Sequence, residues 1–432
     1  MKKVIFTVIS MILVGNAAFA QWSADSVMMG PGSINDVFYS LKNGSVKTEN
    51  NKNWHVAFSL GSMADSGAVW ANHNTGNSFV KVYNVHKDIS QWATVVLDDT
   101  LTASLSFNND QGWYQGALND VAGGSSTQFG WGTYNSTSHD VVGDSIFIIK
   151  ANGIFYKFFI NSLVGSGPNF NDWNFQIGDF AGNTVYDTIK FTNYQDRRFA
   201  YYDLAAAMDA NREPSATAWD MVFNRYSTNN PMSGPNPFNN VIGALSNKGV
   251  KVVKTNMVHV DSAFSHYGDY ISPWPATSGV ISTIGYNWKT FTPPTTWTVP
   301  DSVSYLVQDV PGNLYQLQFL GYGGSGAGVI YLRKRVVVPT AVNDIHSAIT
   351  SYEIFPNPAQ GQLHLMINSK EVVEARLVIT SITGQVVYNS SMSILSGLNT
   401  TQIKTASLPA GNYVLSVKGK GINLNEIITV LN

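Results

Sequence analysis

Residues 53–58 read Asn-Trp-His-Val-Ala-Phe, and residues 218–223 read Ala-Trp-Asp-Met-Val-Phe. Each stretch follows a short aromatic segment at a similar distance, Phe-Tyr-Ser-Leu at 38–41 and Tyr-Tyr-Asp-Leu at 201–204. Similar segments that recur in the same order indicate an internal duplication. The spacing from tryptophan to phenylalanine in both longer stretches predicts strands that pack in a core.

A second pair of stretches predicts one β-hairpin in each copy. Residues 144–158 turn at Asn152-Gly153, and residues 301–317 turn at Pro-Gly-Asn, residues 311–313. Asn-Gly favours the positive φ angles of a tight hairpin turn. Alternating residues share a face of a strand, and that spacing favours packing between sheets over a ligand platform. The residues expected on these faces are Tyr156, Phe158 and Ile160 in the first copy and Tyr315, Leu317 and Phe319 in the second.

The composition argues against several partners. The 432 residues carry 26 basic and 28 acidic side chains, a net charge of −2, so no basic surface for nucleic acid or an acidic membrane is expected. Charged residues make up only 12% of the chain, against about a quarter in typical domains. Cysteine is absent, which excludes disulfides, thiol nucleophiles and thiolate zinc sites.

The first 20 residues predict a signal peptide. Lys2 and Lys3 precede an apolar run at 4–14, and the small residues Ala18 and Ala20 mark a cleavage site before Gln21. The apolar run is too short to cross a bilayer core of about 30 Å, and no later stretch reaches about 18 apolar residues. We therefore expect an exported mature chain without an integral membrane segment.

The C-terminal stretch 352–432 predicts a small antiparallel β-module. Strand-like alternation places Leu363, Leu365 and Ile367 on one face, and the pattern returns near Leu377 and after Gly411. The Phe-Pro-Asn-Pro opening and the later Leu-Pro-x-Gly-x-Tyr motif resemble the type A C-terminal sorting domain of the type IX secretion system of Bacteroidetes. The residues that carry this resemblance, and that form the expected sorting signal, are Phe355, Pro356, Asn357, Pro358, Leu408, Pro409, Gly411 and Tyr413.

These patterns predict an all-β protein with two related antiparallel β-sandwich-like modules and a small C-terminal β-sandwich sorting domain. The expected divisions are a signal peptide at 1–20, a first module at 21–168, a second at 169–337, a linker at 338–351 and the sorting domain at 352–432. The two export signals predict a route through the periplasm and across the outer membrane to the cell surface or the medium. The type IX machinery is the expected partner of the sorting domain.

Sequence motifs for catalysis are missing. The chain has no HExxH helix, no Walker-type loop and no G-x-S-x-G elbow, and its carboxylates are scattered. The glycine-rich stretch at 321–328 lacks the Lys-Ser or Lys-Thr pair of a phosphate loop and precedes a strand. We therefore expect a protein without enzymatic activity.

The duplicated body resembles the HmuY-type family, secreted β-rich haemophores of Bacteroidetes. Residues 219–226 and the hairpin at 312–319 carry the resemblance, and His55 stands in the first copy where the second has Asp220. The resemblance implies haem as a ligand, and imidazole nitrogen and thioether sulfur are axial ligands for haem iron. In the matching interval of the second copy the candidates are His259, His266 and Met257.

The sequence leaves two classes of function open. The first is non-catalytic ligand binding, with haem as the leading candidate. The alternative is a structural or adhesive surface protein, or one that binds a surface glycan through tryptophans near prolines, such as Trp274 or Trp297.

Overall fold

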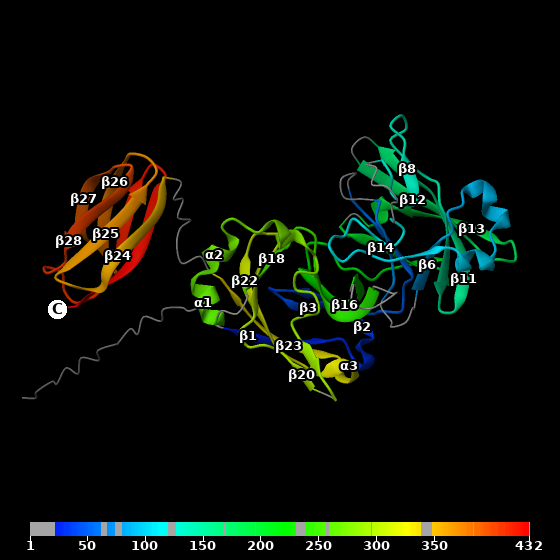
Figure 1. Ribbon diagram of the computed structural model, residues 1–432, viewed down its shortest axis with the longest axis horizontal. Coiled ribbons are helices and arrows are strands. Elements are labelled where there is room, and N and C mark those ends of the chain that lie inside the picture. The colour runs from blue at the N-terminus through cyan, green and yellow to red at the C-terminus, as the bar shows by residue number, and fades with distance from the viewer. Residues whose placement is uncertain are drawn as a thin grey trace, which may run out of the picture. The chain divides into compact units, whose positions relative to one another are not determined.

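The computed structural model describes residues 22–61, 67–73, 80–119, 127–166, 169–194, 196–229, 238–255, 259–294, 296–337, 348–382 and 384–431. Its contacts divide the chain into a unit of residues 1–337 and a unit of residues 338–432, each treated by itself below (Figure 1). The predicted signal peptide with Ala18 and Ala20, the candidate Met257, and residues 338–347 of the predicted linker lie outside the described residues.

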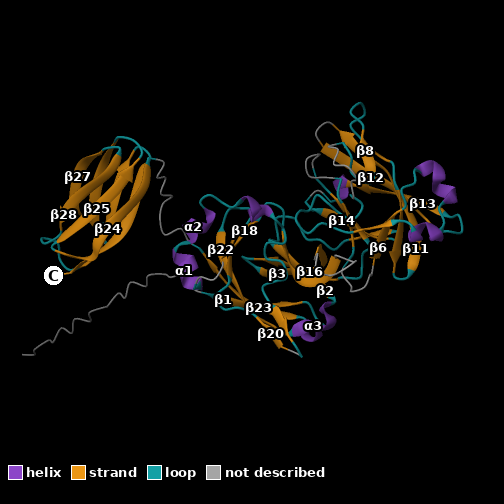
Figure 2. Cartoon of the chain, viewed as in Figure 1, coloured by secondary structure: helices purple, strands orange, loops and turns teal. Residues whose placement is uncertain are grey.

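Antiparallel strands dominate the N-terminal unit, as the sequence predicts, and the described helices are short (Figure 2). One sheet has the order β1-β23-β22-β21-β18 and another the order β13-β12-β11-β10-β6-β7, with β8 and β9 paired beside β11. The strands of the first are β1 (Ser23–Met28), β18 (Lys251–Thr255), β21 (Ser304–Gln308), β22 (Leu314–Tyr322) and β23 (Val329–Val336). The strands of the second are β6 (Val80–Asn84), β7 (Ser104–Ser106), β8 (Gly132–Tyr134), β9 (Val141–Gly143), β10 (Ile146–Ala151), β11 (Ile154–Ser166), β12 (Asn169–Gly178) and β13 (Thr184–Lys190).

Both predicted hairpins are confirmed. β10 pairs with β11 across the Asn152-Gly153 turn, and β21 pairs with β22 across the second turn. Asn152 and Gly153 both have positive φ angles, as this kind of turn requires. The predicted aromatic faces belong to buried clusters, so these rings form core rather than a ligand platform.

Two further sheets have four strands each, with the orders β15-β14-β4-β5 and β17-β16-β2-β3. A separate two-stranded sheet pairs β19 with β20. The strands are β2 (Asn35–Ser40), β3 (Gly44–Asn50), β4 (Val56–Ser59), β5 (Val69–Ala71), β14 (Phe199–Asp203), β15 (Met208–Ala210), β16 (Met221–Asn229), β17 (Phe238–Ser246), β19 (Thr290–Thr292) and β20 (Thr296–Thr298).

The repeated segments pair reciprocally rather than within each copy. β2 of the first copy pairs with β16 of the second, while β14 of the second copy pairs with β4 of the first. The registers match position by position, since Tyr39 faces Met221 and Tyr202 faces Val56. The edge strands of the two larger sheets match as well. β1 of the first copy pairs with β23 of the second, and β13 of the second copy pairs with β12, which corresponds to β23. Each copy therefore contributes its first three strands, β1–β3 or β13–β15, to the half built by the other copy.

Two hydrophobic cores follow this exchange. One core joins residues between Val56 and Leu204, and the other joins residues between Val27 and Leu41 to residues between Met221 and Leu332. We name the first the β13 half and the second the β1 half, after their edge strands. The predicted module boundary at residues 168 and 169 falls between β11 and β12, which pair with each other in the β13 half. The copies in the sequence and the cores in space thus have different limits.

The central strands of the two small sheets, β2, β4, β14 and the first part of β16, are largely buried on both faces. Along β2, Val37 and Tyr39 enter the core of the β1 half, whereas Phe38 enters a third cluster with Trp54 and Trp219. The same alternation along β4, β14 and β16 sends every second side chain into this third cluster. Burial on both faces explains the apolar runs within these strands, at 37–39, 56–58, 199–202 and 221–223.

Short helices complete the N-terminal unit, and none among the described residues is long and apolar enough to span a membrane. The α-helices are α1 (Val260–Ser265), α2 (Tyr267–Ile271) and α3 (Gly324–Ala327), and the 3₁₀ helices are η1 (Pro31–Ser33), η2 (Ile89–Thr94), η3 (Leu97–Leu101), η4 (Phe191–Asn193) and η6 (Ala276–Gly279). Gly328 ends α3 with a φ of 61°, and a Cβ atom there would lie 1.8 Å from the Gly30 carbonyl oxygen. The glycine-rich stretch therefore allows two backbone segments to approach closely.

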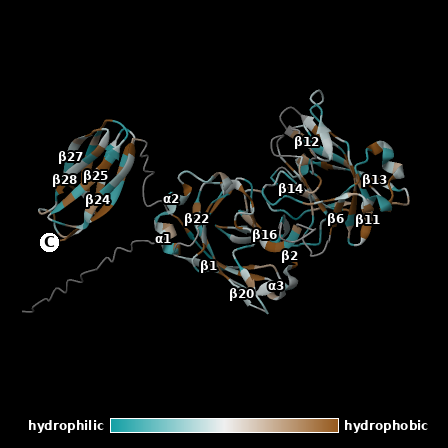
Figure 3. Ribbon diagram, viewed as in Figure 1, coloured by the Kyte–Doolittle hydropathy of each residue, from teal (hydrophilic) through white to brown (hydrophobic). Residues whose placement is uncertain are grey.

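The C-terminal unit is a seven-stranded β-structure with the order β27-β26-β29-β30-β24-β25-β28. Apolar and polar residues are intermixed along its strands in Figure 3. Leu363, Leu365 and Ile367 are buried on one face, as predicted, and their cluster includes Leu377 and Tyr413. The strands are β24 (Ile349–Gln360), β25 (Gln362–Ser369), β26 (Val373–Ser381), β27 (Val386–Ile394), β28 (Gly397–Lys404), β29 (Gly411–Gly419) and β30 (Ile422–Leu431).

Candidate functional site

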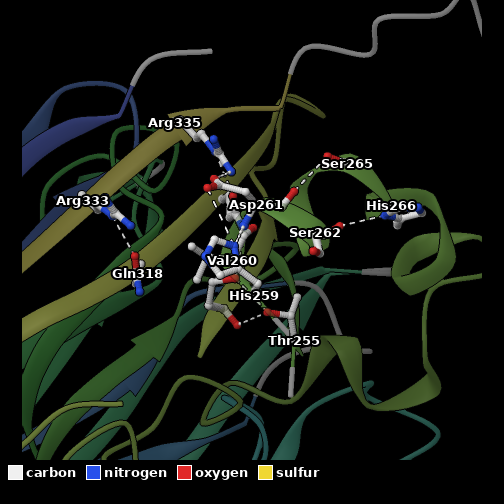
Figure 4. A network of polar contacts seen from close by, with 12 residues as sticks. Thr255, His259, Val260, Asp261, Ser262, Ser265, His266, Gln318, Arg333 and Arg335 are labelled. Atoms are coloured by element: carbon white, nitrogen blue, oxygen red, sulfur yellow. Dashed lines mark hydrogen bonds and ion pairs between the residues drawn. The ribbon is translucent and has the colours of Figure 1, made fainter. Parts of the chain in front are cut away.

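The two candidate haem histidines lie at opposite ends of α1 (Figure 4). His259 precedes the helix, where its Nδ1 accepts a hydrogen bond from the Asp261 amide at 3.3 Å, and its side chain is 75% exposed. His266 follows the helix, with its Nδ1 3.0 Å from the Ser262 carbonyl oxygen. The structure therefore places each ring beside its own helix end and does not line a described cavity with either. Haem ligation by these residues stays a prediction.

α1 itself is held firmly against β22 and β23. Arg335 Nη2 lies 2.9 Å from Asp261 Oδ1 (Figure 4). Gln316 Nε2 donates to the Val260 carbonyl at 2.7 Å. The Arg335 guanidinium also stacks over the Phe264 ring at 3.7 Å. A charge-assisted bond and a cation–π contact on one arginine fix the helix orientation. The histidines thus project from a rigid support.

A small cavity lies within the third cluster, between the two small sheets. Its volume is about 40 Å³, and its walls include Phe38, Trp54 and Trp113. Among the described residues, Trp54 Nε1, His73 Nδ1 and Tyr226 Oη are buried without a hydrogen-bond partner. Burial lowers the pKa of His73 to about 4, so its ring is neutral near pH 7. This space suits about three water molecules and is far smaller than typical pockets for organic ligands.

A buried ion pair stands where the chain crosses from one half to the other. Arg212, between β15 and β16, places Nη2 2.6 Å from Asp36 Oδ2 and donates through Nη1 to the Asn50 carbonyl at 3.1 Å. The neighbouring Glu213 accepts hydrogen bonds from the amides of Arg198 and Phe199, and burial raises its pKa to about 7. These contacts tie the crossing segment to β2, β3 and β14.

A second, polar cleft lies in the β13 half. It has a volume of about 360 Å³, within the range of small-molecule sites. Tyr202 Oη donates to Asp187 Oδ2 at 2.6 Å, and Tyr194 Oη donates to Asp209 Oδ2 at 2.5 Å. Both carboxylates raise the pKa of both phenols, after the larger effect of burial, so all four groups lie in one electrostatic environment. Lys190 and Arg197 also line the cleft.

Sequence reasoning missed this cleft because its residues carry no motif. Asp187 lies on β13, the edge strand of one sheet, whereas Tyr202 on β14 and Asp209 on β15 belong to another sheet. A signal was available within the repeat: an Asp-Tyr pair occurs at corresponding places in both copies, Asp25 with Tyr39 and Asp187 with Tyr202.

The tryptophans considered for glycan binding are partly packed. Lys251 Nζ lies 5.7 Å from the Trp274 ring centre. Trp297 meets Tyr322 edge-on at 5.1 Å and Phe291 at the same separation, and Phe291 is 46% exposed. An aromatic surface therefore exists on the β19–β20 hairpin, whereas Trp274 serves mainly the packing around α2.

The residues of the predicted sorting signal have clear structural roles in the C-terminal unit. Asn357 joins β24 to β30, since its Nδ2 donates to the Ile427 carbonyl at 3.0 Å and its Oδ1 accepts from the Thr429 amide at 2.8 Å. Tyr413 Oη donates to the Pro409 carbonyl at 2.7 Å, which closes the turn before β29. The Phe355 ring stacks on His364. Both ends of the motif thus meet at the last strands of the module.

This arrangement defines a small β-module with its own hydrophobic core. Residues 353–430 match the family model of the secretion system C-terminal sorting domain. The match confirms the predicted sorting domain and indicates export by the type IX secretion system, to the cell surface or the extracellular space.

Other comparisons add little to this assignment. No curated protein matches the chain. The C-terminal domain of Wzt is similar at 18% identity over 19% of this chain and 72% of that one, with a TM-score of 0.16. Dimeric latent PorU from Porphyromonas gingivalis is similar at 9% identity over 94% of this chain and 34% of that one, with a TM-score of 0.17. The chain thus spans about a third of the PorU chain.

Proposed function

We propose that this protein is exported by the type IX secretion system and acts outside the outer membrane as a non-catalytic binding protein. Its C-terminal unit serves export, and its N-terminal unit holds the ligand. The observation that carries the binding role is the 360 Å³ polar cleft of the β13 half, whose size and mixed carboxylate, phenol and cationic lining suit a small polar molecule.

Native mass spectrometry of the mature protein, purified from the medium or surface of its own cell, tests the binding role. We expect a small molecule to copurify and to be lost on denaturation. A protein that carries no small molecule, and that takes up none from the spent medium of its own cells, would overturn the proposal.

Haem is the ligand that the sequence resemblance suggests, through His259 and His266. The 40 Å³ cavity cannot hold a porphyrin, so haem binding would use the exposed surface around α1. Titration of haemin into the mature protein should shift the Soret band, and the His259→Ala/His266→Ala double variant should abolish that shift. His86→Ala is the matched control. No Soret shift, or equal shifts in wild type and double variant, would remove haem as the ligand of these histidines.

Glycan binding is a second candidate, and the exposed ring of Phe291 beside Trp297 favours it. Aromatic faces on an exposed hairpin can stack on the apolar faces of sugar rings. A glycan array should then give hits that Phe291→Ala weakens. An array without hits would leave the hairpin as a structural element of a surface protein.

A further inference from the structure

The two halves contain the same pair, a half-buried aspartate bonded to a buried tyrosine, at corresponding positions. Asp25 on β1 faces Leu332 on β23, and its Oδ2 accepts a hydrogen bond from Tyr39 Oη at 2.7 Å. Asp187 on β13 faces Phe175 on β12, and its Oδ2 accepts from Tyr202 Oη at 2.6 Å. The duplication therefore permits a direct comparison of what surrounds each carboxylate.

In the β1 half the chain supplies its own cation to this pair. Lys334 Nζ lies 3.6 Å from Asp25 Oδ2, donates to the Ser40 carbonyl at 3.3 Å and lies 4.5 Å from the Tyr39 ring centre. The ammonium is largely buried and receives compensation from a carboxylate, a carbonyl and an aromatic face. This arrangement is a complete binding site for a primary ammonium group.

The β13 half lacks that lysine. In the β1 half, Lys334 faces Leu317 on the neighbouring strand. Phe158 corresponds to Leu317 in the other copy, and it faces Ile177. An isoleucine therefore stands where the β1 half has the lysine. Among the described residues, Asp187 and Asp209 form no ion pair, and the cationic Arg197 instead donates to Asn211 and lies 4.0 Å from Asp196. The 360 Å³ cleft opens beside these two carboxylates.

We propose that the cleft of the β13 half binds a small molecule through a primary ammonium group held by Asp187 and Asp209, in the role that Lys334 Nζ fills in the β1 half. Lys190 and Arg197 also line the cleft, and their cationic groups can bind hydroxyl or carboxylate groups elsewhere on the ligand. The expected class is a compact organic amine, such as an amino sugar or an amino acid, rather than a neutral sugar. The proposal rests on the proposed binding function and names the chemistry of its ligand.

Ligand-observed NMR on the full mature chain tests the proposal with two matched probe pairs. Butylamine reproduces the end of a lysine side chain and butan-1-ol is its neutral counterpart, while glucosamine and glucose form the second pair. We expect both amines to bind at least about tenfold more tightly than their neutral counterparts, since a charge-assisted contact adds over 1.4 kcal/mol, a factor of ten. Equal binding within each pair would overturn the ammonium proposal.

Five variants test where the amine binds. Asp187→Asn and Asp209→Asn should each weaken amine binding about tenfold, whereas Asp196→Asn, at an exposed carboxylate outside the cleft lining, should leave it unchanged. Ile177→Lys should abolish amine binding, because the new ammonium group would occupy the place of the ligand's. Ile177→Met introduces an uncharged side chain of about the length of lysine and should keep amine binding. Circular dichroism and thermal melts confirm that each variant folds.

Two results separate this proposal from the broader binding role. Binding of glucose but not of the amines, weakened by the same aspartate variants, would overturn the ammonium class and preserve ligand binding in the cleft. Binding of none of the four probes, in a protein that also carries no copurifying molecule, would overturn both.

Discussion

His55 and Asp220 perform the same task at corresponding positions of the two copies. His55 Nδ1 accepts a hydrogen bond from the Leu204 amide at 3.0 Å, and Asp220 Oδ2 accepts one from the Leu41 amide at 2.6 Å. The backbone amide of His55 donates to the Tyr202 carbonyl, and that of Asp220 donates to the Tyr39 carbonyl. Tyr202 and Tyr39 lie two positions before Leu204 and Leu41, respectively. A histidine and an aspartate thus replace one another as buried acceptors.

The first prediction concerns these two acceptors. His55→Ala and Asp220→Ala should each lower the free energy of unfolding by about 1–3 kcal/mol, because each leaves a buried amide without its partner. His55→Asn and Asp220→Asn keep an acceptor and should lose less. Urea denaturation measures all four. Alanine variants as stable as the wild type would show that these bonds contribute nothing net.

The second prediction concerns pH. The pKa of His73 falls from 6.5 to about 4 on folding, so its contribution to stability is complete above 6.5 and is lost as the pH falls toward 4. The pKa of Glu213 rises from 4.5 to about 7, so its contribution is complete below 4.5 and is lost as the pH rises toward 7. At roughly 1.4 kcal/mol per pKa unit, each effect amounts to about 3 kcal/mol, with opposite sign.

The two effects largely cancel in the wild type between pH 4.5 and 6.5, and single variants should expose them. In Glu213→Gln only the effect of His73 remains, so the free energy of unfolding should rise with pH over this interval. In His73→Phe only the effect of Glu213 remains, so the free energy of unfolding should fall. Chemical denaturation at several pH values measures the slopes. Parallel profiles for the two variants would contradict the assignment of these buried groups.

The third prediction concerns the ion pair at the crossing segment. Arg212→Met should cost about 3–5 kcal/mol, since it removes the guanidinium that compensates a buried carboxylate. The Arg212→Met/Asp36→Asn double variant removes both charges together and should be more stable than the single variant. A double-mutant cycle by urea denaturation measures the coupling, and additive losses would show that the pair is not coupled.

The fourth prediction concerns export. Deletion of residues 338–432 should leave the protein in the periplasm, because the sorting domain is lost while the N-terminal unit keeps both of its cores. Cell fractionation and immunoblotting measure the distribution. Unchanged amounts in the medium or on the surface would show a route independent of this domain.

The fifth prediction concerns the stability of the sorting domain itself. Asn357→Ala removes two hydrogen bonds to β30 and should destabilise the C-terminal unit by about 1–3 kcal/mol. Asn389→Ala removes one exposed bond to Arg376 and should cost less than about 1 kcal/mol. Hydrogen exchange of the β30 amides distinguishes the two, and equal protection in both variants would contradict the role of Asn357.

Local patterns predicted local structure well. Turn residues and alternation identified both hairpins, and period-two spacing identified the buried faces of β22 and β25, because these features depend on neighbours in sequence. Strand partners were not predictable in the same way. Because the two copies are alike, an apolar partner for Tyr39 exists in each of them, Val56 in its own copy and Met221 in the other. Only the packed structure shows that Tyr39 faces Met221. The cleft at Asp187 was missed although its lining residues all lie between 187 and 211, because they carry no recognised motif and their arrangement depends on how β13, β14 and β15 pair with other strands.

The reciprocal strand exchange also sets the order in which the N-terminal unit can fold. β1–β3 leave the ribosome first, yet their partners in the β1 half begin at Met221 and end at Val336. β2 can pair with β3 alone, but β1 and the other edge of β2 have no partner until β16 and β23 have been synthesised, and such non-local pairing favours slow folding of the β1 half. A late-folding half gives the secretory pathway an unfolded chain to translocate before its two copies interlock.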